Sequence, residues 1–227
     1  MYHTLVRQAV KGARPRRPRD SLTREQVVRA ALALADEKGL EALTMPNLAR
    51  NLECGVMTIY GYVDSKEDLL GAIAQLGLVD LKLARPVPET VDGILKAWGR
   101  GLRQTLIAHP SLPAIFLAQP VIGQAIFRGL EALLGRLKAA GMSPAAGAPA
   151  VYAVLIYTTG YLAWEIPRTM RAPAADYAAG WRRQYAQLPP GEFPLSGSVL
   201  EELANVAGES QFELGLEALA TGLAGRL

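Results

Sequence analysis

The sequence predicts an all-α protein, in which a small N-terminal module of short helices precedes a larger helical domain. Helix start and stop signals follow one another closely from residue 21 onward, whereas no recurring alternation of apolar and polar residues indicates a strand. A chain of 227 residues, half of them hydrophobic, is long enough for such a module and for a second domain with its own core. We therefore expect three parts: residues 1–20, 21–70 and 71–227.

The first part is a basic segment. Residues 1–19 hold six of the 24 basic residues of the chain and none of its 21 acidic residues. This composition, rich in proline and arginine, cannot bury a core, and no apolar secretory signal follows it, so we expect disorder in the free protein. The segment is either a solubilising leader or an arm that binds nucleic acid through its arginines, Arg14, Arg16, Arg17 and Arg19.

The second part shows four helix signals in close succession. The first helix starts at a capping box, Thr23–Gln26, and stops at Gly39. The second covers Thr44–Leu52, with a proline in its first turn. A tight connection leads to a third helix over 56–63, and a longer helix begins with a second capping box at Ser65.

Two short helices joined by a tight turn, with a polar face on the second helix, are typical of a helix-turn-helix that reads DNA. Ile59 and Val63 can pack inward, so Thr58, Gly61 and Tyr62 would share the opposite face. In a major groove Thr58 would contact a base edge or a thymine methyl group, and Gly61 would permit close approach. The alternative is a three-helix bundle with an ordinary solvated face.

Residues near this face favour DNA binding. Tyr60 and Tyr62 would reach phosphates or bases. Lys66 lies in the first turn of the next helix, where the helix dipole disfavours a cation unless a phosphate docks at the same helix end. Residues 20–70 carry five basic and nine acidic residues, so general attraction to DNA would come largely from the arginine arm.

Residues 23–70 resemble the DNA-binding domain of the tetracycline-repressor family of bacterial transcription regulators. The resemblance rests on separated segments in register: Lys38-Gly39-Leu40, Leu43-Thr44, Leu48-Ala49, Thr58-Ile59-Tyr60, Val63 and Ser65-Lys66-Glu67-Asp68-Leu69-Leu70. It implies that the recognition helix carries Thr58, Tyr60, Gly61 and Tyr62. It also implies that the positions of Thr44 and Lys66 hold the phosphate backbone.

Two features depart from the family pattern. The turn between the two DNA-binding helices usually has a glycine where this chain has Glu53, so we expect strain in the turn or a shift by one residue. The metal-chelating histidines of tetracycline-responsive members are not apparent, so we expect neither a tetracycline–magnesium ligand nor another metal or cofactor.

The third part is predicted to be helical beyond residue 88. We expect helices at 89–109, 111–118, 121–140, 144–168, 174–187, 197–206 and 209–225. This part resembles, less strongly, the ligand-binding and dimer-forming domain of the same family, in which the long helix and the last helix form a four-helix bundle with a second copy. The clean apolar stretch 151–164 is too short for a membrane span, so we expect a cytoplasmic protein without membrane contact. The uncharged helix over 144–164 has more apolar surface than one short chain can readily cover, so we expect a homodimer.

Two uncharged stretches interrupted by proline and glycine, 104–127 and 139–164, would wrap a core or line a cavity. Seven side chains are candidate ligand contacts, although the aromatic ones would serve equally well as plain core: Trp98, His109, Phe116, Phe127, Tyr157, Tyr161 and Trp164. Because no buried counter-charge is evident, we expect an apolar or aromatic ligand that is neutral or weakly charged.

These features together predict a ligand-responsive dimeric repressor, which binds a palindromic DNA operator and is released by a small molecule. The alternative is a constitutive DNA-binding regulator without an inducer, which a solid C-terminal core would favour. We do not expect an enzyme, because the sequence has no phosphate-binding Gly-Lys-Ser loop, nucleophile elbow or metal-binding cluster.

Overall fold

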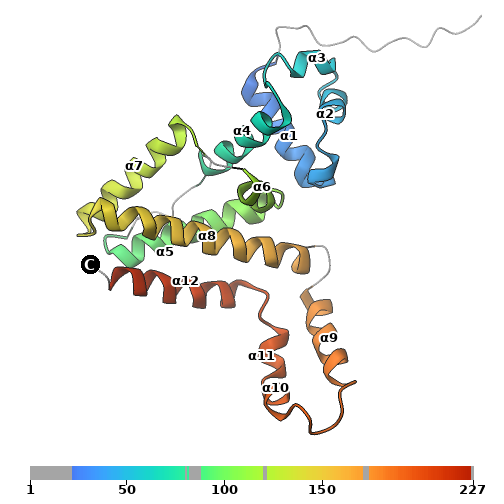
Figure 1. The fold of residues 1–227 in the computed structure, drawn as a ribbon, viewed down its shortest axis with the longest axis vertical. Helices are drawn as coiled ribbons and strands as arrows, with labels where there is room; N and C mark the ends of the chain where they lie inside the picture. The colour runs from blue at the N-terminus through green and yellow to red at the C-terminus, as the bar shows by residue number, and fades with distance from the viewer. Residues whose placement is uncertain (1–21, 80, 82–87, 120–121, 171–173, 226–227) are drawn as a thin grey trace, which may run out of the picture.

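The structure is a computed structural model that describes residues 22–79, 81, 88–119, 122–170 and 174–225. Every regular element in these ranges is a helix (Figure 1), so the predicted all-α class is confirmed. The N-terminal module contains α1 (Arg24–Lys38), the short 3₁₀ helix η2 (Leu40–Ala42), α2 (Met45–Asn51), α3 (Val56–Ile59) and the start of α4 (Lys66–Val79). The remaining helices are α5 (Val91–Ala108), α6 (Leu112–Ala118), α7 (Gln124–Ala139), α8 (Pro144–Thr169), α9 (Ala174–Tyr185), α10 (Pro194–Ser198), α11 (Leu200–Ala204) and α12 (Glu209–Ala224).

Local capping signals place most helix ends where the sequence predicts them. At the start of α1 the Thr23 hydroxyl accepts from the Gln26 amide, and the Gln26 side chain accepts from the Thr23 amide, which confirms the first capping box. Two predicted helices differ. The helix expected at 56–63 ends at Ile59, and the helix expected at 197–206 is divided into α10 and α11 because Val199 leaves the helical conformation.

The helix α4 connects the module with the C-terminal domain, because it packs against α1 and also against α6 and α7. Gly77 permits a close approach to α6, since a Cβ atom there would lie 2.7 Å from Leu112. The expected boundary at residue 70 therefore falls inside a continuous helix, of which the part expected beyond Val79 lies mostly outside the described residues.

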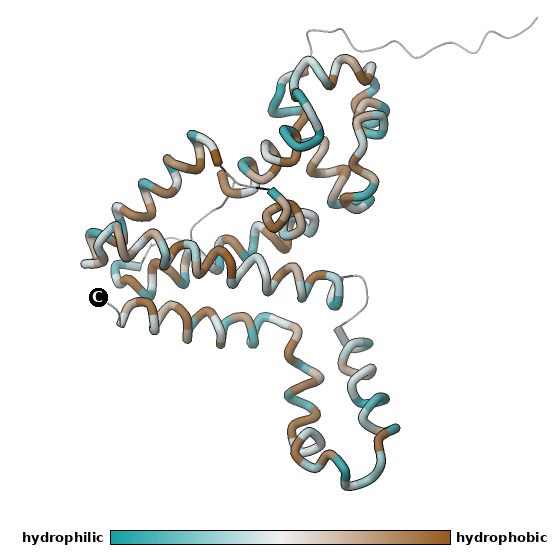
Figure 2. Tube along the Cα trace, viewed as in Figure 1, coloured by the Kyte–Doolittle hydropathy of each residue, from teal (hydrophilic) through white to brown (hydrophobic). Residues whose placement is uncertain are grey.

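Three mutually packed helices, α5, α8 and α12, form the main layer of the C-terminal domain, and α6 and α7 cover α8 from another side (Figure 1). A Cβ atom at Gly99 would lie 2.7 Å from Leu216 and 3.0 Å from Val154, so glycine lets α5 approach both neighbours. By length and composition α8 could cross a membrane, but Val154 and Leu162 are buried against other helices, which is the environment of a core helix. Figure 2 shows that apolar residues recur along both α8 and α12.

Beyond α8 the chain forms a projecting arm of α9, α10 and α11, which extends away from the helical layers (Figure 1). The arm is held together by a bidentate ion pair in which Arg182 donates to Glu201 at 2.9 and 2.6 Å. The Tyr185 hydroxyl also donates to the carbonyl of Phe193. Where the projecting arm joins α8, the rings of Trp164 of α8 and Tyr177 of α9 pack edge to face, with 6.1 Å between the ring centroids.

Candidate functional site

The turn between α2 and α3 keeps its register despite the missing glycine. Glu53 has φ +52°, the left-handed conformation that glycine enters freely and other residues enter at a cost of about 1–2 kcal/mol. The amide of Cys54 donates to Ala49 and the amide of Glu53 donates to Arg50, which is the bonding pattern of a Schellman cap. Of the two expected outcomes, strain or a shifted turn, the structure shows the left-handed backbone without a shift.

Replacing Glu53 by glycine is expected to stabilise the protein by about 0.5–1 kcal/mol, because glycine relieves the left-handed strain at a smaller entropic cost. Urea denaturation at a fixed protein concentration measures this difference. The control is Glu37→Gly inside α1, which should have the opposite sign and destabilise by about 1 kcal/mol. A Glu53→Gly protein that unfolds at the same urea concentration as the wild type, or at a lower one, would show that the turn is unstrained.

The recognition segment begins as the short helix α3 and continues as a tighter turn, since the amides of Gly61 and Tyr62 bond three residues back. Ile59 and Val63 are buried, as their spacing predicts. Thr58 is half-buried, whereas Tyr60 and Gly61 are exposed. Met57, which no sequence pattern marks as a contact, lies on the same segment and is 80% exposed.

Tyr62 lies differently from the expectation. Its hydroxyl donates to the carbonyl of Leu22 at 2.9 Å, and its ring is half-buried against the core. The hydroxyl is therefore engaged within the protein, and Tyr62 fastens the recognition segment. Arg24 fastens the same segment, because its Nε donates to the Tyr62 carbonyl and its Nη2 donates to Asp68 Oδ1 at 2.9 Å.

Thr44 and Lys66 lie at two helix ends that flank the recognition segment in the chain. The Thr44 hydroxyl accepts from the Asn47 amide as the cap of α2, so its own O–H can still donate to a phosphate. Lys66 is the first residue of α4 and is exposed.

The Ser65 hydroxyl accepts from the Asp68 amide, but the Asp68 carboxylate accepts from the Asp64 amide rather than from that of Ser65. The predicted capping box at the start of α4 is therefore displaced by one residue.

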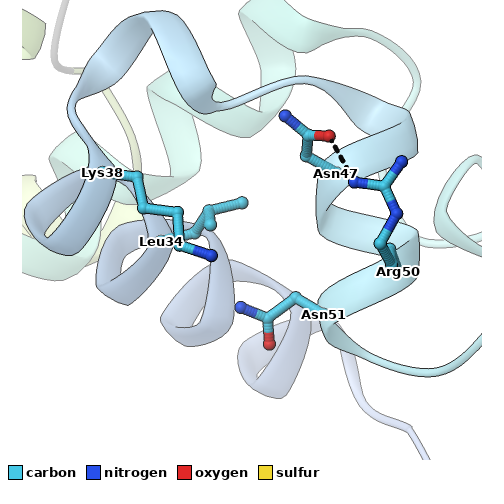
Figure 3. A pocket seen from close by; sticks show the side chains of 5 residues that line it. All are labelled: Leu34, Lys38, Asn47, Arg50 and Asn51. Carbon is cyan, nitrogen blue, oxygen red and sulfur yellow. Dashed lines mark hydrogen bonds between the residues drawn. The ribbon is translucent and has the colours of Figure 1, made fainter.

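A surface recess of about 410 Å³ lies between α1 and α2 (Figure 3). Lys38 of α1 faces Asn51 of α2 across it, and the Asn47 side chain accepts from Arg50 on the α2 side. No sequence pattern indicates this recess, because its lining residues come from two helices. The four predicted arm residues, Arg14, Arg16, Arg17 and Arg19, lie outside the described residues.

His109, which is predicted as a ligand contact, also connects the two domains. Its Nδ1 lies 2.7 Å from Oδ2 of Asp36, near the end of α1. The amide and hydroxyl of Ser111 donate to Oδ1 of the same carboxylate at 3.0 and 2.6 Å. A second polar connection joins α4 to the segment before α7, where the Gln75 side chain donates to the carbonyl of Ile122 at 2.9 Å.

The two tyrosines predicted to orient a ligand use their hydroxyls within the protein. Tyr157 donates to the carbonyl of Phe212, and Tyr161 is within hydrogen-bonding distance of the carbonyls of Val206 and Gly208. Both rings lie about 5.5 Å from the Phe212 ring. Burial raises the pKa of Tyr157 to about 12, so its hydroxyl stays protonated and remains a donor at neutral pH. These residues hold the start of α12 in place.

The other predicted ligand contacts are dispersed. Phe127 is 63% exposed on α7, so it packs into neither core nor cavity in this chain. Trp98 and Phe116 are half-buried against the core, with Phe116 close to Gly77 of α4. Trp164 lies under the guanidinium of Arg168, whose Cζ is 4.4 Å from the ring centroid. For all seven residues a ligand contact remains a prediction.

A hollow of about 570 Å³ opens between α5 and α12, and none of the seven predicted residues lines it. Its walls are Arg100, Arg103, Gln104 and Ile107 of α5 with Glu209 and Glu213 of α12. Such a volume is in the usual range for small-molecule sites. The sequence did not reveal the hollow because these two groups of residues are about a hundred positions apart.

Arg103, which lines this hollow, belongs to a buried ion pair. Arg103 of α5 donates to both carboxylate oxygens of Glu165 of α8 at 2.6 and 3.1 Å, and the two side chains are only 10% and 7% exposed. The Arg103 guanidinium also lies over the Phe212 ring at 4.9 Å. The expectation of a C-terminal domain without buried charge was therefore wrong, because Arg103 and Glu165 neutralise each other across two helices. Among the described residues, no group of three or more His, Cys, Asp or Glu side chains could hold a metal ion.

Comparison with known proteins finds two matching family profiles. The profile described as "Bacterial regulatory proteins, tetR family" matches residues 27–73, and "Tetracyclin repressor-like, C-terminal domain" matches residues 86–227. The chain is 28% identical over 230 residues to the HTH-type transcriptional repressor DrrR1 of Streptomyces coeruleorubidus, covering 93% of this chain and 81% of that repressor. It is 27% identical to the HTH-type transcriptional repressor Rv1353c of Mycobacterium tuberculosis, covering 97% and 87%. Among solved structures, ActR of Streptomyces coelicolor in complex with actinorhodin superimposes with a TM-score of 0.79 at 26% identity, covering 91% of this chain and 97% of that chain.

Proposed function

The chain belongs to the tetracycline-repressor (TetR) family of transcriptional regulators. We propose that it is a dimeric repressor that binds a palindromic DNA operator and dissociates from it when a small molecule binds. The observation that carries the proposal is that both parts of the chain match the family. The helix-turn-helix module, called the reading head below, matches at residues 27–73, and the C-terminal domain matches at residues 86–227. The protein would act on DNA in the cytoplasm.

The reading head divides into holding and reading residues. Thr44 and Lys66 offer an O–H and an ammonium group at helix ends, which suits phosphate oxygens. Thr58, Tyr60 and Gly61 lie on the recognition segment and would meet base edges or the adjoining phosphates. Tyr62 and Arg24 would fix the angle at which this segment enters the groove.

The dimer would form through α8 and α12. Two large apolar side chains four residues apart on α8, Tyr152 and Ile156, are 60% and 64% exposed, and Leu214 of the adjacent α12 is 63% exposed. Burial of these side chains against a second copy would bring two helices from each chain together as a four-helix bundle. Two reading heads would then face successive major grooves, which requires a palindromic operator.

Release would act through the polar connections between the domains. Asp36 ties the end of α1 to the α5–α6 corner, and Gln75 ties α4 to the start of the α7 segment. A ligand that displaces α5 or α6 would therefore change the orientation of both α1 and α4, and with it the spacing of the two heads. ActR, solved with actinorhodin, supports a small-molecule ligand by analogy.

A constitutive DNA-binding regulator is the alternative function. The closely packed ring cluster of Tyr157, Tyr161 and Phe212 favours it, because these aromatic side chains fill core space instead of lining a cavity. The open hollow between α5 and α12 favours the ligand-responsive repressor.

The proposed head is tested by separating base reading from phosphate holding. We expect Lys66→Ala to weaken binding to all DNA sequences alike and to reduce the log–log salt slope by about one. We expect Thr58→Ala to change the preference at a defined operator position by about 1–3 kcal/mol. Selection of bound DNA from a random pool, followed by fluorescence anisotropy at several salt concentrations, measures both effects.

The matched control is Lys138→Ala, which removes the same charge from the last turn of α7 in the other domain. It should leave both the salt slope and the sequence preference unchanged. A uniform loss of affinity for Thr58→Ala as well as Lys66→Ala would mean that the recognition face lies elsewhere on the module.

A further inference from the structure

Resting on the proposed function, we infer that the hollow between α5 and α12 binds an aromatic acid, whose carboxylate is held between Arg100 and Arg103. The sequence suggested a neutral or weakly charged ligand, whereas this site favours an anionic one. The inference depends on the charges around the hollow, on the unused hydrogen-bond donors of the two arginines, and on the apolar surface beside them.

The two arginines lie three residues apart on α5, so their side chains share one face of the helix and both line the hollow. Each is held by a different neighbour. Arg103 is bound by Glu165 of α8, and Arg100 is bound by Glu213 of α12 through contacts of 2.7–3.0 Å. The hydrogen bond to Glu213 raises the pKa of Arg100 further, so Arg100 is a cation at any physiological pH.

This arrangement leaves a place for one further anion. From α8 across α5 to α12 the paired charges run Glu165, Arg103, Arg100, Glu213, and Glu209 adds a further carboxylate to the lining of the hollow. A carboxylate between the arginines would complete an alternating series of five charges and offset the repulsion between two like charges at this spacing.

The arginines also retain donors for such a carboxylate. Arg103 bonds Glu165 through Nη1 and Nη2, and Arg100 bonds Glu213 through Nε and Nη2. Within the part of the chain that the structure describes, Arg103 Nε and Arg100 Nη1 have no hydrogen-bond partner. Since Arg103 is nine-tenths buried and stacked on Phe212, its free N–H has a fixed direction, which favours a planar acceptor.

The remainder of the hollow suits a flat apolar body. Ile107 is a partly exposed apolar side chain on its wall, one turn beyond Arg103. Gln104 adds an amide and Glu209 a second carboxylate, beside that of Glu213, to the lining. A volume of about 570 Å³ accommodates a molecule of two or three fused rings with one acidic group. The chemical class is therefore an aromatic carboxylic acid.

The test compares 2-naphthoate with 2-naphthamide, which has the same shape without the charge. By isothermal titration calorimetry we expect the wild-type protein to bind the acid at least about tenfold more tightly than the amide. Arg100→Gln should abolish most of this preference. Because loss of Arg103 alone would leave Glu165 buried and unpaired, the second variant is the double substitution Arg103→Met with Glu165→Met, which removes the buried pair together.

The matched control is Arg182→Gln, which breaks another bidentate arginine–glutamate pair, on the projecting arm, and should leave the preference for the acid intact. Equal binding of acid and amide, no binding of the acid at millimolar concentration, or a preference that survives both variants at the hollow would each overturn the inference. Operator binding is followed in the same samples. Arginine-dependent binding of the acid without any change in operator affinity would confirm this site and refute the inducer mechanism. Release of the operator by a neutral compound, unaffected by the double substitution, would support the repressor function and overturn the acid site.

Discussion

Replacing Ile156 by arginine is expected to separate the dimer into monomers and to weaken operator binding by about 10²–10⁴-fold. Ile156 is an exposed apolar residue at the centre of the proposed α8–α12 interface, beside Tyr152. An arginine there would have to lose its hydration inside an apolar four-helix bundle without a partner, which costs several kcal/mol. Separate monomers would each bind one half-site, so the gain from linking two heads would be lost.

Sedimentation velocity at micromolar concentration measures the assembly state, and fluorescence anisotropy with a palindromic operator measures the affinity. The control is Phe127→Arg on α7, because Phe127 is 63% exposed and Ile156 is 64% exposed. This control should remain dimeric with normal operator binding. If Ile156→Arg also remains a dimer, the two copies must meet through another surface.

Replacing Glu165 by methionine is expected to destabilise the protein by about 3–5 kcal/mol, because it leaves the Arg103 guanidinium buried without its counter-charge. The double substitution that also replaces Arg103 by methionine should recover most of this loss, since two apolar side chains of similar length fill the space without charge. Urea denaturation at one protein concentration measures both values, and the fixed concentration matters because association with a second copy adds to stability.

An exposed pair of the same geometry gives the comparison. Glu201→Met breaks the Arg182–Glu201 pair on the projecting arm, where both side chains are largely in solvent. Screening by water limits its contribution, so we expect a much smaller loss of stability than for Glu165→Met. If Glu165→Met and Glu201→Met lose similar amounts, or if the double substitution is as unstable as Glu165→Met alone, the buried pair does not behave as its burial implies.

Short-range signals explain the parts of the fold that could be predicted. The capping box at Thr23, the proline in the first turn of α2 and the inward spacing of Ile59 and Val63 each involve residues no more than four apart. Their geometry depends on local backbone conformation and helix periodicity, which one segment of sequence contains in full. The left-handed Glu53 belongs to the same class, because a turn of this kind requires that conformation whatever residue occupies it.

The candidate site was predictable only where it lies on one continuous segment. The positions of Thr44, Thr58 and Lys66 at helix ends and on the recognition segment follow from local signals, and their DNA contacts stay a prediction. Tyr62 is the exception, because its hydroxyl partner is Leu22, which is 40 residues earlier in the chain. Helix periodicity places Tyr62 on an exposed face, but it cannot reveal that a segment distant in the sequence covers that face.

By itself, then, the sequence determined the helical class, the order and caps of the helices, and the reading head of a DNA-binding regulator. Tertiary structure alone decided the connection of His109 to Asp36, the use of Tyr157 and Tyr161 as anchors for α12, and the charged hollow at Arg103. The physical reason is separation along the chain. Arg103 meets Glu165 across 62 residues and Arg100 meets Glu213 across 113, so these pairs exist only after α5, α8 and α12 have packed together. From composition alone, Arg103 and Glu165 would be taken as solvated charges. Only the packing of the helices shows that they form a buried ion pair beside an open hollow.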